Sequence, residues 1–392
     1  MMRILAAALG FLAIAGCTDA PTAADGSNND SLRILSAKGG AGGGTTKINS
    51  VTVTPASASI QAGATIQLAA TSKPGTASSF AWATSNASVA TVSQSGLVTG
   101  IAPGVATISA TASGKTGRSA ITVTAPPPAG SVVMIGAGDI SDCNNNNDEA
   151  TARLLDANPD GTVFVLGDNA YENGSAADYS NCYNPTWGRH KSRTMPSVGN
   201  HEYNTAGATG YYGYFGAAAG DPAKGYYSYD LGDWHVVVLN SNIGFIDASA
   251  QLAWLSADLS ASTKSCTLAY WHHPRFSSGS GHGNNSAMQP FWDALYAADA
   301  DVVLNGHDHD YERFAPQTPS GAADNQRGIR EFVVGTGGRA LYSLGTLRAN
   351  SQVFNASTFG VLKLTLSAGS YSWEFIPVAG QTFTDSGTAS CH

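Results

Sequence analysis

The sequence predicts a β-sandwich followed by an α/β domain in which helices cover buried sheets. Between residues 47 and 125, short runs of alternating apolar and polar residues are separated by glycine turns, which is typical of antiparallel sheets. From residue 131 to 392 the apolar runs are nearly continuous, and strands of that kind are buried on both faces. Segments with helical periodicity separate these runs, so we expect sheets flanked by helices, with polar chemistry at the strand ends.

The composition fits this division and excludes one class of function. A chain of 392 residues, 43% of them hydrophobic, is long enough for two packed domains. Only 12% of the residues are charged and 45 are glycine, which favours loops and β-structure over long charged helices. The formal net charge is −8 and no run of Lys or Arg occurs, so a surface that coats nucleic acid is not expected.

The N-terminus has the features of a targeting segment. Residues 1–17 begin with Arg3, continue with an apolar stretch (4–15) too short to span a bilayer, and end at Cys17 after small residues. This pattern resembles a bacterial lipoprotein signal, which predicts that Cys17 carries a lipid and that the protein contacts the membrane only through this anchor. The alternative is an ordinary secretory signal in which the cysteine is incidental. Either interpretation predicts a protein outside the cytoplasm, anchored to the cell envelope or secreted, where disulfides persist.

The next segments predict a tether, an all-β domain and a linker. Residues 18–46 are rich in Ala, Gly, Ser, Asn and Asp and cannot bury enough apolar surface to fold. Residues 47–125 contain the alternating pattern, and the stretch 88–108 resembles the group 2 bacterial immunoglobulin-like domain. Trp82 is expected in its core, and without a titratable cluster the domain is expected to act as a spacer or in adhesion. Residues 126–130 (Pro-Pro-Pro-Ala-Gly) predict a stiff linker.

Five polar motifs occur in the α/β region where strands are expected to end. The expected strands are 132–135, 162–166, 234–239, 268–271 and 302–304, and the expected helices are 151–155, 248–259 and 288–298. The motifs are Gly138-Asp139, Gly167-Asp168-Asn169-Ala170-Tyr171, Gly199-Asn200-His201-Glu202, His272-His273-Pro274 and Gly306-His307-Asp308-His309. Singly, a Gly-Asp pair is usually a turn, and a buried histidine is usually a hydrogen-bonded core residue. Together, oxygen and imidazole donors at successive strand ends predict a metal site.

The order of these motifs resembles that of the calcineurin-like metallophosphoesterase superfamily. The usual first motif there is Asp-x-His, but Asp139-Ile140-Ser141 lacks the histidine, and the second motif supplies Tyr171 instead. Together with the segment 306–313 (Gly-His-Asp-His-Asp-Tyr-Glu-Arg), this substitution is similar to the purple acid phosphatases. The resemblance covers roughly residues 131–340 and implies a four-layer αββα sandwich. Plant members carry a different β-sandwich before the catalytic domain.

The resemblance implies two metal ions that share Asp168. The ligands of the first ion would be one oxygen of Asp168 together with Asp139, Tyr171 and His309. Those of the second ion would be the other oxygen of Asp168 together with Asn200, His272 and His307. A phenol binds a metal only when a strongly charged ion removes its proton, so Tyr171 predicts ferric iron, as the family precedent does. The amide and two imidazoles suit a divalent ion: zinc, ferrous iron or manganese.

The same resemblance assigns roles to the residues around the metals. His201, next to the ligand Asn200, would protonate the leaving alcohol or hold a phosphate oxygen. His282 matches the position of a further histidine at the rim of the site. Three more residues are expected to orient the ligands from behind them: Glu202, His273 and Asp308.

The sequence contains five cysteines. With Cys17 assigned to the lipid, the remaining cysteines allow three disulfide pairings. Cys143 and Cys182 each follow a metal-ligand motif, so we pair them with each other, and Cys266 with Cys391. A four-cysteine zinc site is the alternative, although no Cys-x-x-Cys spacing supports it.

These observations predict an exported phosphatase that uses two metals to hydrolyse a small phosphate monoester by attack of a metal-bound hydroxide. Two alternatives remain: a phosphodiesterase or nucleotidase with the same metal site, and an inert surface-binding protein on a phosphatase fold. The intact ligand set disfavours the inert protein. Substrate preference is expected to depend on loops such as 204–225 and 275–287, and the glycine-rich segment 335–338 is expected to be only a tight turn.

Overall fold

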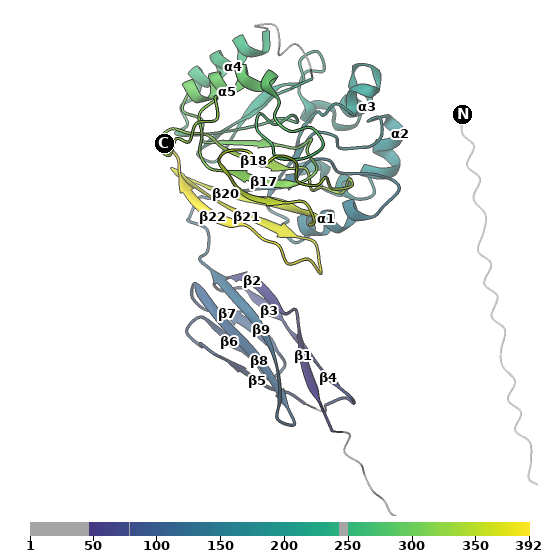
Figure 1. Cartoon of the computed structure of the whole chain (residues 1–392), viewed down its shortest axis with the longest axis vertical. Coiled ribbons are helices and arrows are strands. Elements are labelled where there is room, and N and C mark those ends of the chain that lie inside the picture. Colours follow the sequence, from purple (N-terminus) through teal and green to yellow (C-terminus); the bar gives the residue numbers. More distant parts are fainter. Residues whose placement is uncertain (1–46, 78, 243–249) are drawn as a thin grey trace, which may run out of the picture. The chain divides into compact units, whose positions relative to one another are not determined.

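The computed structural model describes residues 47–77, 79–242 and 250–392. The predicted signal (1–17), its Cys17 and the predicted tether (18–46) lie outside the described residues. Among the residues that are described, no helix combines the length and the apolar character needed to cross a membrane. The chain divides into two compact units, and the boundary along the sequence falls between Thr124 and Ala125 (Figure 1).

The first unit is built from short strands (Figure 1). They are β1 (Ser50–Thr54), β2 (Ser57–Gln61), β3 (Thr65–Gln67), β4 (Ala69–Lys73), β5 (Ala81–Thr84), β6 (Ala90–Val92), β7 (Leu97–Gly100), β8 (Gly104–Ala112) and β9 (Lys115–Thr124). The sheet orders are β1-β4, β3-β7-β6 and β2-β9-β8-β5, with β2 and β9 parallel and the other described pairs antiparallel. Trp82, Val98 and Ile108 are buried together. The predicted β-sandwich and the core position of Trp82 are confirmed.

The second unit contains two larger sheets. One has the strand order β12-β11-β10-β20-β21-β22, and the other has the order β13-β14-β15-β16-β18-β17-β19. The strands are β10 (Val132–Ala137), β11 (Thr162–Leu166), β12 (Thr194–Ser197), β13 (Tyr227–Leu231), β14 (Trp234–Val238), β15 (Cys266–Tyr270), β16 (Val302–Asn305), β17 (Tyr311–Phe314), β18 (Arg330–Val334), β19 (Ser351–Asn355), β20 (Gly360–Ser367), β21 (Ser370–Pro377) and β22 (Ser386–Ser390).

Helices surround these sheets. The α-helices are α1 (Asn147–Asp156), α2 (Ala176–Asp178), α3 (Thr209–Phe215), α4 (Ala250–Ala261) and α5 (Gln289–Ala297). A π-helical turn, η1 (Tyr179–Tyr183), is joined by short 3₁₀ helices: η2 (Trp187–Arg193), η3 (Glu202–Asn204), η4 (Ala206–Ala208), η5 (Gly216–Ala219) and η6 (Ser286–Met288). The expected helices correspond to α1, α4 and α5, although residues 248–249 lie outside the described part. The short helices α2 and α3 were not predicted.

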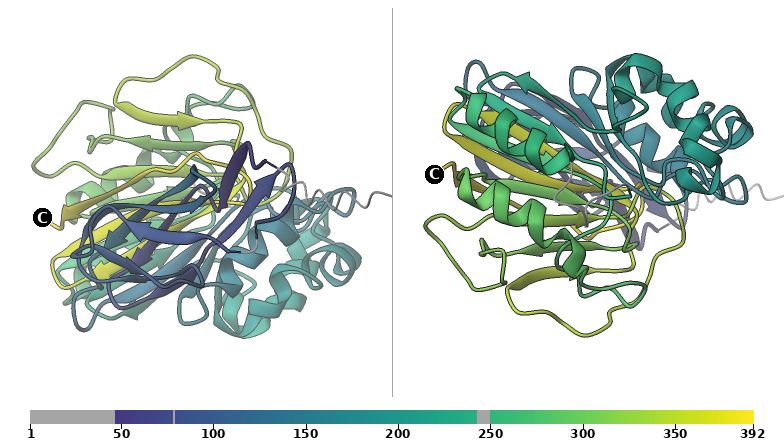
Figure 2. Two further views of the ribbon diagram at one scale, coloured as in Figure 1. Left: turned by 90° about the horizontal axis from the view of Figure 1, so that it is seen from below. Right: turned by 90° about the horizontal axis from the view of Figure 1, so that it is seen from above.

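Alternation of side chains explains the layers. On β14, Val236 packs into the core shared by both sheets, whereas Val237 packs into a second core with α4 and α5. Leu268 and Ala269 on β15 face the same two cores in turn. On the other sheet, α1 packs against β20. Figures 1 and 2 show the resulting order of helices, sheet, sheet and helix, which confirms the predicted four-layer sandwich.

Parallel pairing gathers the strand ends that carry the motifs. β11 lies parallel to β10 and β12, and β15 lies parallel to β14 and β16. Carboxyl ends of parallel strands lie at one edge of a sheet, so the loops after β10, β11 and β12 gather at an edge of one sheet and those after β15 and β16 at an edge of the other. The two sheets share one core, and the two groups of loops meet where His272 approaches Asp168 and Asn200. The sequence did not predict that β20 would pair antiparallel with β10, placing the last strands of the chain in the same sheet.

Both disulfides form as we paired them, Cys143 with Cys182 and Cys266 with Cys391. This pairing rules out the four-cysteine zinc site. The first bridge joins the loop after β10 to η1, and the second joins β15 to the residue before the C-terminal His392. On the chain-entropy view, bridges with sequence separations of 39 and 125 residues each contribute about 3–5 kcal/mol.

Candidate metal centre

The structure brings the predicted metal ligands together at the carboxyl ends of the parallel strands. The loop after β10 supplies Asp139, and the loop after β11 supplies Asp168 and Tyr171. Asn200 follows β12, His272 follows β15, and both His307 and His309 follow β16. Their donor atoms form two groups that have Asp168 in common. We name them the tyrosine subsite and the imidazole subsite.

The tyrosine subsite consists of Asp139, Asp168, Tyr171 and His309. Oη of Tyr171 lies 3.0 Å from Oδ1 of Asp139 and 3.3 Å from Oδ2 of Asp168. Nε2 of His309 lies 3.2 Å from the same phenol oxygen and 3.3 Å from Oδ1 of Asp139. Two carboxylates and a phenol therefore converge, so the donors of this subsite are mainly oxygens.

The imidazole subsite consists of Asp168, Asn200, His272 and His307. Nε2 of His272 lies 3.0 Å from Oδ1 of Asn200 and 3.1 Å from Nδ1 of His307. The same nitrogen lies 3.2 Å from Oδ2 of Asp168. Apart from the shared carboxylate, the donors here are an amide oxygen and imidazole nitrogens.

A single oxygen of Asp168 faces both subsites, which differs from the expectation that each oxygen serves one metal. Oδ2 is the atom close to Oη of Tyr171 and to Nε2 of His272. Oδ1 instead accepts a hydrogen bond from the backbone N–H of His201 at 2.8 Å. The backbone N–H of His201 occupies the second oxygen, so Oδ2 is the oxygen of Asp168 that would be available to ions in both subsites.

Hydrogen bonds around the histidines fit a metal centre. Nδ1 of His272 lies 2.8 Å from the carbonyl oxygen of Leu166, and Nδ1 of His309 lies 2.8 Å from that of Ala340. A carbonyl oxygen can only accept, so each Nδ1 carries the proton and each Nε2 turns a lone pair toward the site. Lone pairs then face one another within each subsite, an arrangement that a bound cation stabilises.

Burial and neighbouring charges shift the pKa values of the buried groups at the site. Burial raises the pKa of Asp168, but the charges of His272 and His201 outweigh it and hold that pKa well below its usual range. Burial opposes protonation of His272, yet Asp168 raises the pKa of this imidazole to about 9. Burial, with the charges of Asp139 and Asp168, raises the pKa of Tyr171 well above its usual range. The phenol therefore keeps its proton until a cation replaces it.

Several ligand residues have unusual backbone conformations. The φ angles of Asp139, Asp168 and His307 are 59°, 49° and 70°, in the left-handed region. Such conformations cost of order 1–3 kcal/mol each and persist where surrounding contacts enforce them. Gly199 permits one of those contacts, because a Cβ atom there would lie 2.1 Å from Oδ1 of Asp168. A larger residue than glycine would displace the bridging carboxylate.

Glu202 connects two of the loops from beneath the ligands. Its Oε2 accepts hydrogen bonds from the backbone N–H groups of Asp168 at 2.9 Å and Gly199 at 2.7 Å. Its Oε1 accepts from the N–H of Asn169 at 2.8 Å and from the hydroxyl of Tyr179 at 3.1 Å. Burial and the charge of Asp168 raise the pKa of Glu202 to about 7. These contacts fit the role expected for Glu202, which acts on the backbone and not on ligand side chains.

Asp308 contacts the loop of His282, which differs from the expectation that it orients a metal ligand. Oδ1 of Asp308 accepts a hydrogen bond from the N–H of His282 at 2.9 Å. Oδ2 accepts from the N–H of Gly283 at 2.8 Å and from the hydroxyl of Ser277. The ring of His282 stacks on that of His307, with centroids 3.8 Å apart. Asp308 therefore holds the loop that carries the histidine at the rim.

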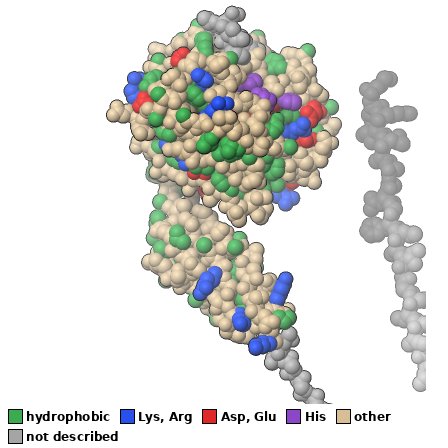
Figure 3. All heavy atoms as spheres, viewed as in Figure 1, with side chains coloured by type: hydrophobic (Ala, Val, Ile, Leu, Met, Phe, Trp, Pro, Cys, Tyr) green, Lys and Arg blue, Asp and Glu red, His purple; other side chains and the backbone are tan. Residues whose placement is uncertain are grey.

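His201 lies at the opening of the site. Its Nδ1 lies 2.6 Å from the carbonyl oxygen of Glu172, so this nitrogen donates and Nε2 is free to exchange a proton. Nε2 lies 3.9 Å from Oδ2 of Asp168, and 29% of the side chain is exposed. Figure 3 shows histidine side chains gathered on one face of the second unit. His201 and the exposed His282 are thus reachable from solvent.

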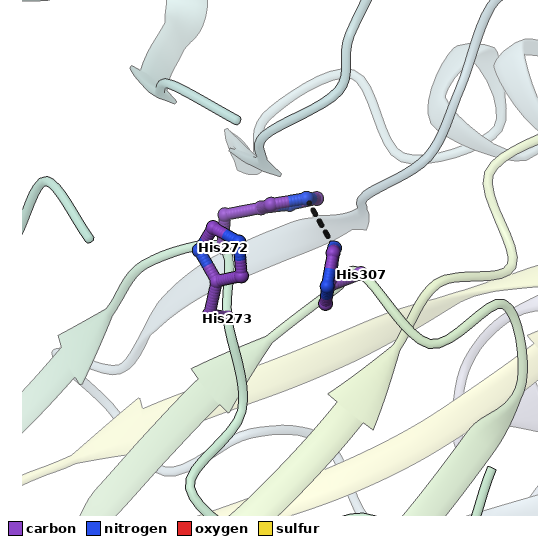
Figure 4. A group of neighbouring side chains, drawn as sticks. All are labelled: His272, His273 and His307. Carbon is purple, nitrogen blue, oxygen red and sulfur yellow. Dashed lines mark hydrogen bonds between the residues drawn. The ribbon is translucent and has the colours of Figure 1, made fainter. Parts of the chain in front are cut away.

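His273 lies beside the imidazole subsite. Figure 4 shows its ring next to those of His272 and His307, and the centroid distances are 5.0 Å and 4.3 Å. Nδ1 of His273 lies 2.7 Å from the hydroxyl oxygen of Ser241. This imidazole is therefore close enough to influence the ligands directly.

Sequence reasoning missed Arg339. Its guanidinium lies 4.7 Å from the centre of the Tyr171 ring, within the range of a cation–π interaction. The same group forms ion pairs with Asp142 at 2.5 Å and Glu172 at 2.6 Å. Its backbone N–H donates to the carbonyl oxygen of Asp139 at 2.9 Å. Arg339 therefore contacts two of the residues of the tyrosine subsite.

Sequence reasoning also missed Tyr342. Arg339 and Tyr342 both follow the segment 335–338, which we expected to be only a tight turn. The ring of Tyr342 stacks on that of His309, with centroids 4.0 Å apart and an interplanar angle of 8°. Within the turn, the N–H of Gly337 donates to the carbonyl oxygen of Gly138 at 2.9 Å. The turn thus holds the two missed residues against the loop that carries Asp139.

Two segments of the chain match known protein families. Residues 47–124 match the group 2 bacterial Ig-like domain, and residues 134–311 match the calcineurin-like phosphoesterase family. These two segments therefore match, in order, a bacterial Ig-like domain and a calcineurin-like phosphoesterase domain, as the sequence predicted.

Among phosphoesterases, the chain is similar to purple acid phosphatases. It is 27% identical to purple acid phosphatase 15 of Arabidopsis thaliana over 204 residues, which cover 43% of this chain and 38% of the relative. It is 30% identical to purple acid phosphatase 23 of the same plant over 205 residues, covering 43% and 45%. With purple acid phosphatase 1 of Ipomoea batatas the identity is 27% over 216 residues, covering 49% and 45%. The chain spans less than half the length of these curated relatives.

Solved structures support the fold. Purple acid phosphatase PPD1 from yellow lupin (Lupinus luteus) superposes with a TM-score of 0.54 and 17% identity, covering 83% of this chain and 67% of that one. GAP50, described as the anchor in the inner membrane complex of Plasmodium, gives a TM-score of 0.51 at 15% identity, covering 65% and 88%. At such identities the likeness concerns the fold alone.

Proposed function

We propose that the second unit is a dinuclear-metal phosphatase that hydrolyses phosphate monoesters. One observation carries this proposal: donor side chains from five strand ends converge in two groups around one oxygen of Asp168. Paired cations that share a carboxylate suit phosphoryl transfer, because they would supply an activated water and stabilise charge on the phosphate oxygens. The similarity to purple acid phosphatases supports the same reaction class.

The two subsites would hold different ions. In the tyrosine subsite, a trivalent hard ion would replace the phenol proton of Tyr171, and we propose ferric iron. In the imidazole subsite, an amide and neutral imidazoles suit zinc, ferrous iron or manganese. The shared Oδ2 of Asp168 would belong to both ions, with its partner oxygen held by the backbone of His201.

The histidines at the opening would handle the substrate. His201 has a proton-exchanging Nε2 that faces the site while its Nδ1 is fixed by Glu172, so it would protonate the leaving alcohol or hold a phosphate oxygen. His282 stacks on the ligand His307 and would contact a phosphate oxygen from the opposite side. Asp308 would position His282 through the bonds to its loop.

We also propose an extracytoplasmic location. The disulfides Cys143–Cys182 and Cys266–Cys391 are consistent with an oxidising compartment, and so is the bacterial Ig-like domain. A lipid on Cys17 would anchor the chain, and residues 18–46 with the Ig-like domain would separate the phosphatase from the membrane. Mass spectrometry of the mature N-terminus tests this proposal, because an unprocessed Met1 would contradict export, and a processed chain without a lipid on Cys17 would contradict the anchor.

Substitution of Asn200 tests the enzymatic proposal. Asn200→Ala removes a neutral donor from the imidazole subsite, so hydrolysis of an aryl phosphate monoester should disappear while the circular dichroism spectrum is unchanged. Asn181→Ala, at an exposed position of η1, is the matched control and should retain activity. Full activity of Asn200→Ala would exclude the proposed site.

A substrate panel separates the remaining functions. Faster hydrolysis of an aryl phosphate monoester than of a bis-aryl phosphate diester is expected, and the opposite preference would indicate a phosphodiesterase. Elemental analysis of the purified protein should find two metal ions per chain. A protein without bound metal and without hydrolytic activity would be an inert binding protein.

A further inference from the structure

His273 is placed like a metal ligand in addition to those that the sequence motifs supply. One nitrogen from each of His272, His273 and His307 lies within 4.8 Å of the other two. Figure 4 shows that one ring nitrogen of His273 is turned toward the other imidazoles, while the other nitrogen is turned away. The histidines come from the loops after β15 and β16, which are neighbouring parallel strands.

The outward nitrogen of His273 is bound in the way that ligand histidines are. Its Nδ1 lies 2.7 Å from Oγ of Ser241, a side chain that is 1% exposed. The backbone N–H of His273 also donates to this oxygen at 3.3 Å. His272 has a related arrangement, in which the carbonyl oxygen of Leu166 accepts from its Nδ1. A hydroxyl can donate as well as accept, and when Oγ of Ser241 accepts from Nδ1 of His273, Nε2 is left for a cation.

We propose that His273 is a third imidazole ligand of the imidazole subsite, and that it makes this subsite select zinc over manganese. The inference rests on the proposed dinuclear centre and identifies the chemistry of its divalent half. Nitrogen-rich sites favour zinc, whereas manganese prefers carboxylate, carbonyl and water oxygens. Three imidazoles, one amide oxygen and a shared carboxylate oxygen form a set of the first kind.

The spacing of the nitrogens is compatible with zinc. Zinc–nitrogen bonds of about 2.0–2.1 Å place neighbouring ligand nitrogens roughly 3–3.5 Å apart. Nε2 of His272 and Nδ1 of His307 are already 3.1 Å apart. The nitrogen of His273 lies within 4.8 Å of both and would approach them further to bind the same ion.

Metal competition tests this ligand. The full-length protein, His273→Ala and His235→Ala are dialysed against equal concentrations of zinc and manganese salts, freed of unbound metal and analysed for both elements. Loss of a ligand should lower the zinc-to-manganese ratio by about tenfold or more, given that outer partners alone change metal affinity 10- to 100-fold. His235→Ala removes an imidazole that is paired with Asp230 and Asp258 and lies outside the three-histidine group, so its ratio should match the wild type.

X-ray absorption at the zinc edge gives a readout that a merely structural role would not change. The imidazole signal of bound zinc should decrease from three rings to two in His273→Ala, and near-ultraviolet circular dichroism should verify that the variant is folded. An unchanged metal ratio together with an unchanged imidazole count would overturn the role of His273 and leave the dinuclear site intact. Wild-type protein that binds no metal would instead overturn the proposed function as well.

Discussion

The tyrosine and imidazole subsites share Asp168 but differ in every other donor. Besides Asp168, the tyrosine subsite contains a carboxylate, a phenol and one imidazole. Arg339 and Tyr342, which follow the turn at 335–338, contact its aromatic and imidazole rings. The imidazole subsite adds an amide and imidazoles, and it lies beside the histidines at the opening. Under the proposed function, this difference would suit a highly charged ion in the tyrosine subsite and an exchangeable divalent ion in the imidazole subsite.

Substitution of Asp168 should have the largest effect, because both subsites share this carboxylate. Asp168→Asn keeps the volume of the side chain but removes its charge and its bridging capacity. Both metals should be lost, and aryl phosphate hydrolysis should fall by more than the roughly hundredfold loss that outer-partner substitutions cause. Asp221→Asn, which changes an exposed carboxylate, is the control. Retention of two metals by Asp168→Asn would contradict the role of Asp168 as a ligand shared by both subsites.

Graded chelation should separate the two subsites. A mild chelator should remove the divalent ion and abolish activity, while the ion held by Asp139 and Tyr171 remains. A strong chelator should remove both ions and lower the melting temperature of the second unit, since a ligand at a thousand times its Kd stabilises by about 4 kcal/mol. Calorimetry with elemental analysis measures both effects. Simultaneous loss of the two ions under mild conditions would contradict an unequal pair.

Removal of the phenol should affect one subsite only. Ferric iron bound to Tyr171 is expected to give a visible charge-transfer band, so Tyr171→Phe should be colourless. The divalent ion should remain, because Asn200, His272 and His307 are unchanged. A visible spectrum and metal content of the same sample provide the measurement. A variant that kept its colour would show that the phenol is not a ligand.

Substitution of Arg339 should have the smallest effect, because Arg339 contacts Tyr171 only through a cation–π interaction with its ring. Arg339→Gln removes the positive charge over the phenol ring, so the visible band should shift and activity should change by the few-fold that about 0.5–1 kcal/mol of cation–π energy allows. Arg339→Lys retains a charge and should shift the band less. Identical spectra for all three proteins would mean that the guanidinium serves only its ion pairs with Asp142 and Glu172.

Much of the site could be predicted because each motif follows a buried strand. Apolar runs identify such strands, and parallel pairing gathers the motifs at one edge of each sheet. Packing of the two sheets around a shared core then brings residues as distant as Asp139 and His309 together. The choice of one Asp168 oxygen as the bridge was not predictable, because it depends on the backbone N–H of His201 approaching the other oxygen. The contacts of Asp308 were missed similarly, since its sequence neighbours are ligands but its spatial neighbours belong to the loop of His282.

Other parts of the fold left no readable signal. The turn at 335–338 contains no donor side chain apart from a threonine, so its sequence does not indicate that Arg339 lies over the ring of Tyr171. Helices α2 and α3 are too short to show periodicity. The pairing of β20 with β10 joins segments more than 200 residues apart, and strand partners at that separation cannot be read from local pattern.

That pairing of β20 with β10 has a consequence for how the protein matures. The strand that ends in front of Asp139 is flanked on one side by β11 and on the other by residues 360–367. During synthesis, β10 therefore waits with one edge open until nearly the whole chain has emerged, and an open edge invites pairing with the wrong partner. Under the proposed function, the metal centre would be completed only after this late step, so a chain shortened before residue 360 should accumulate as an aggregation-prone precursor.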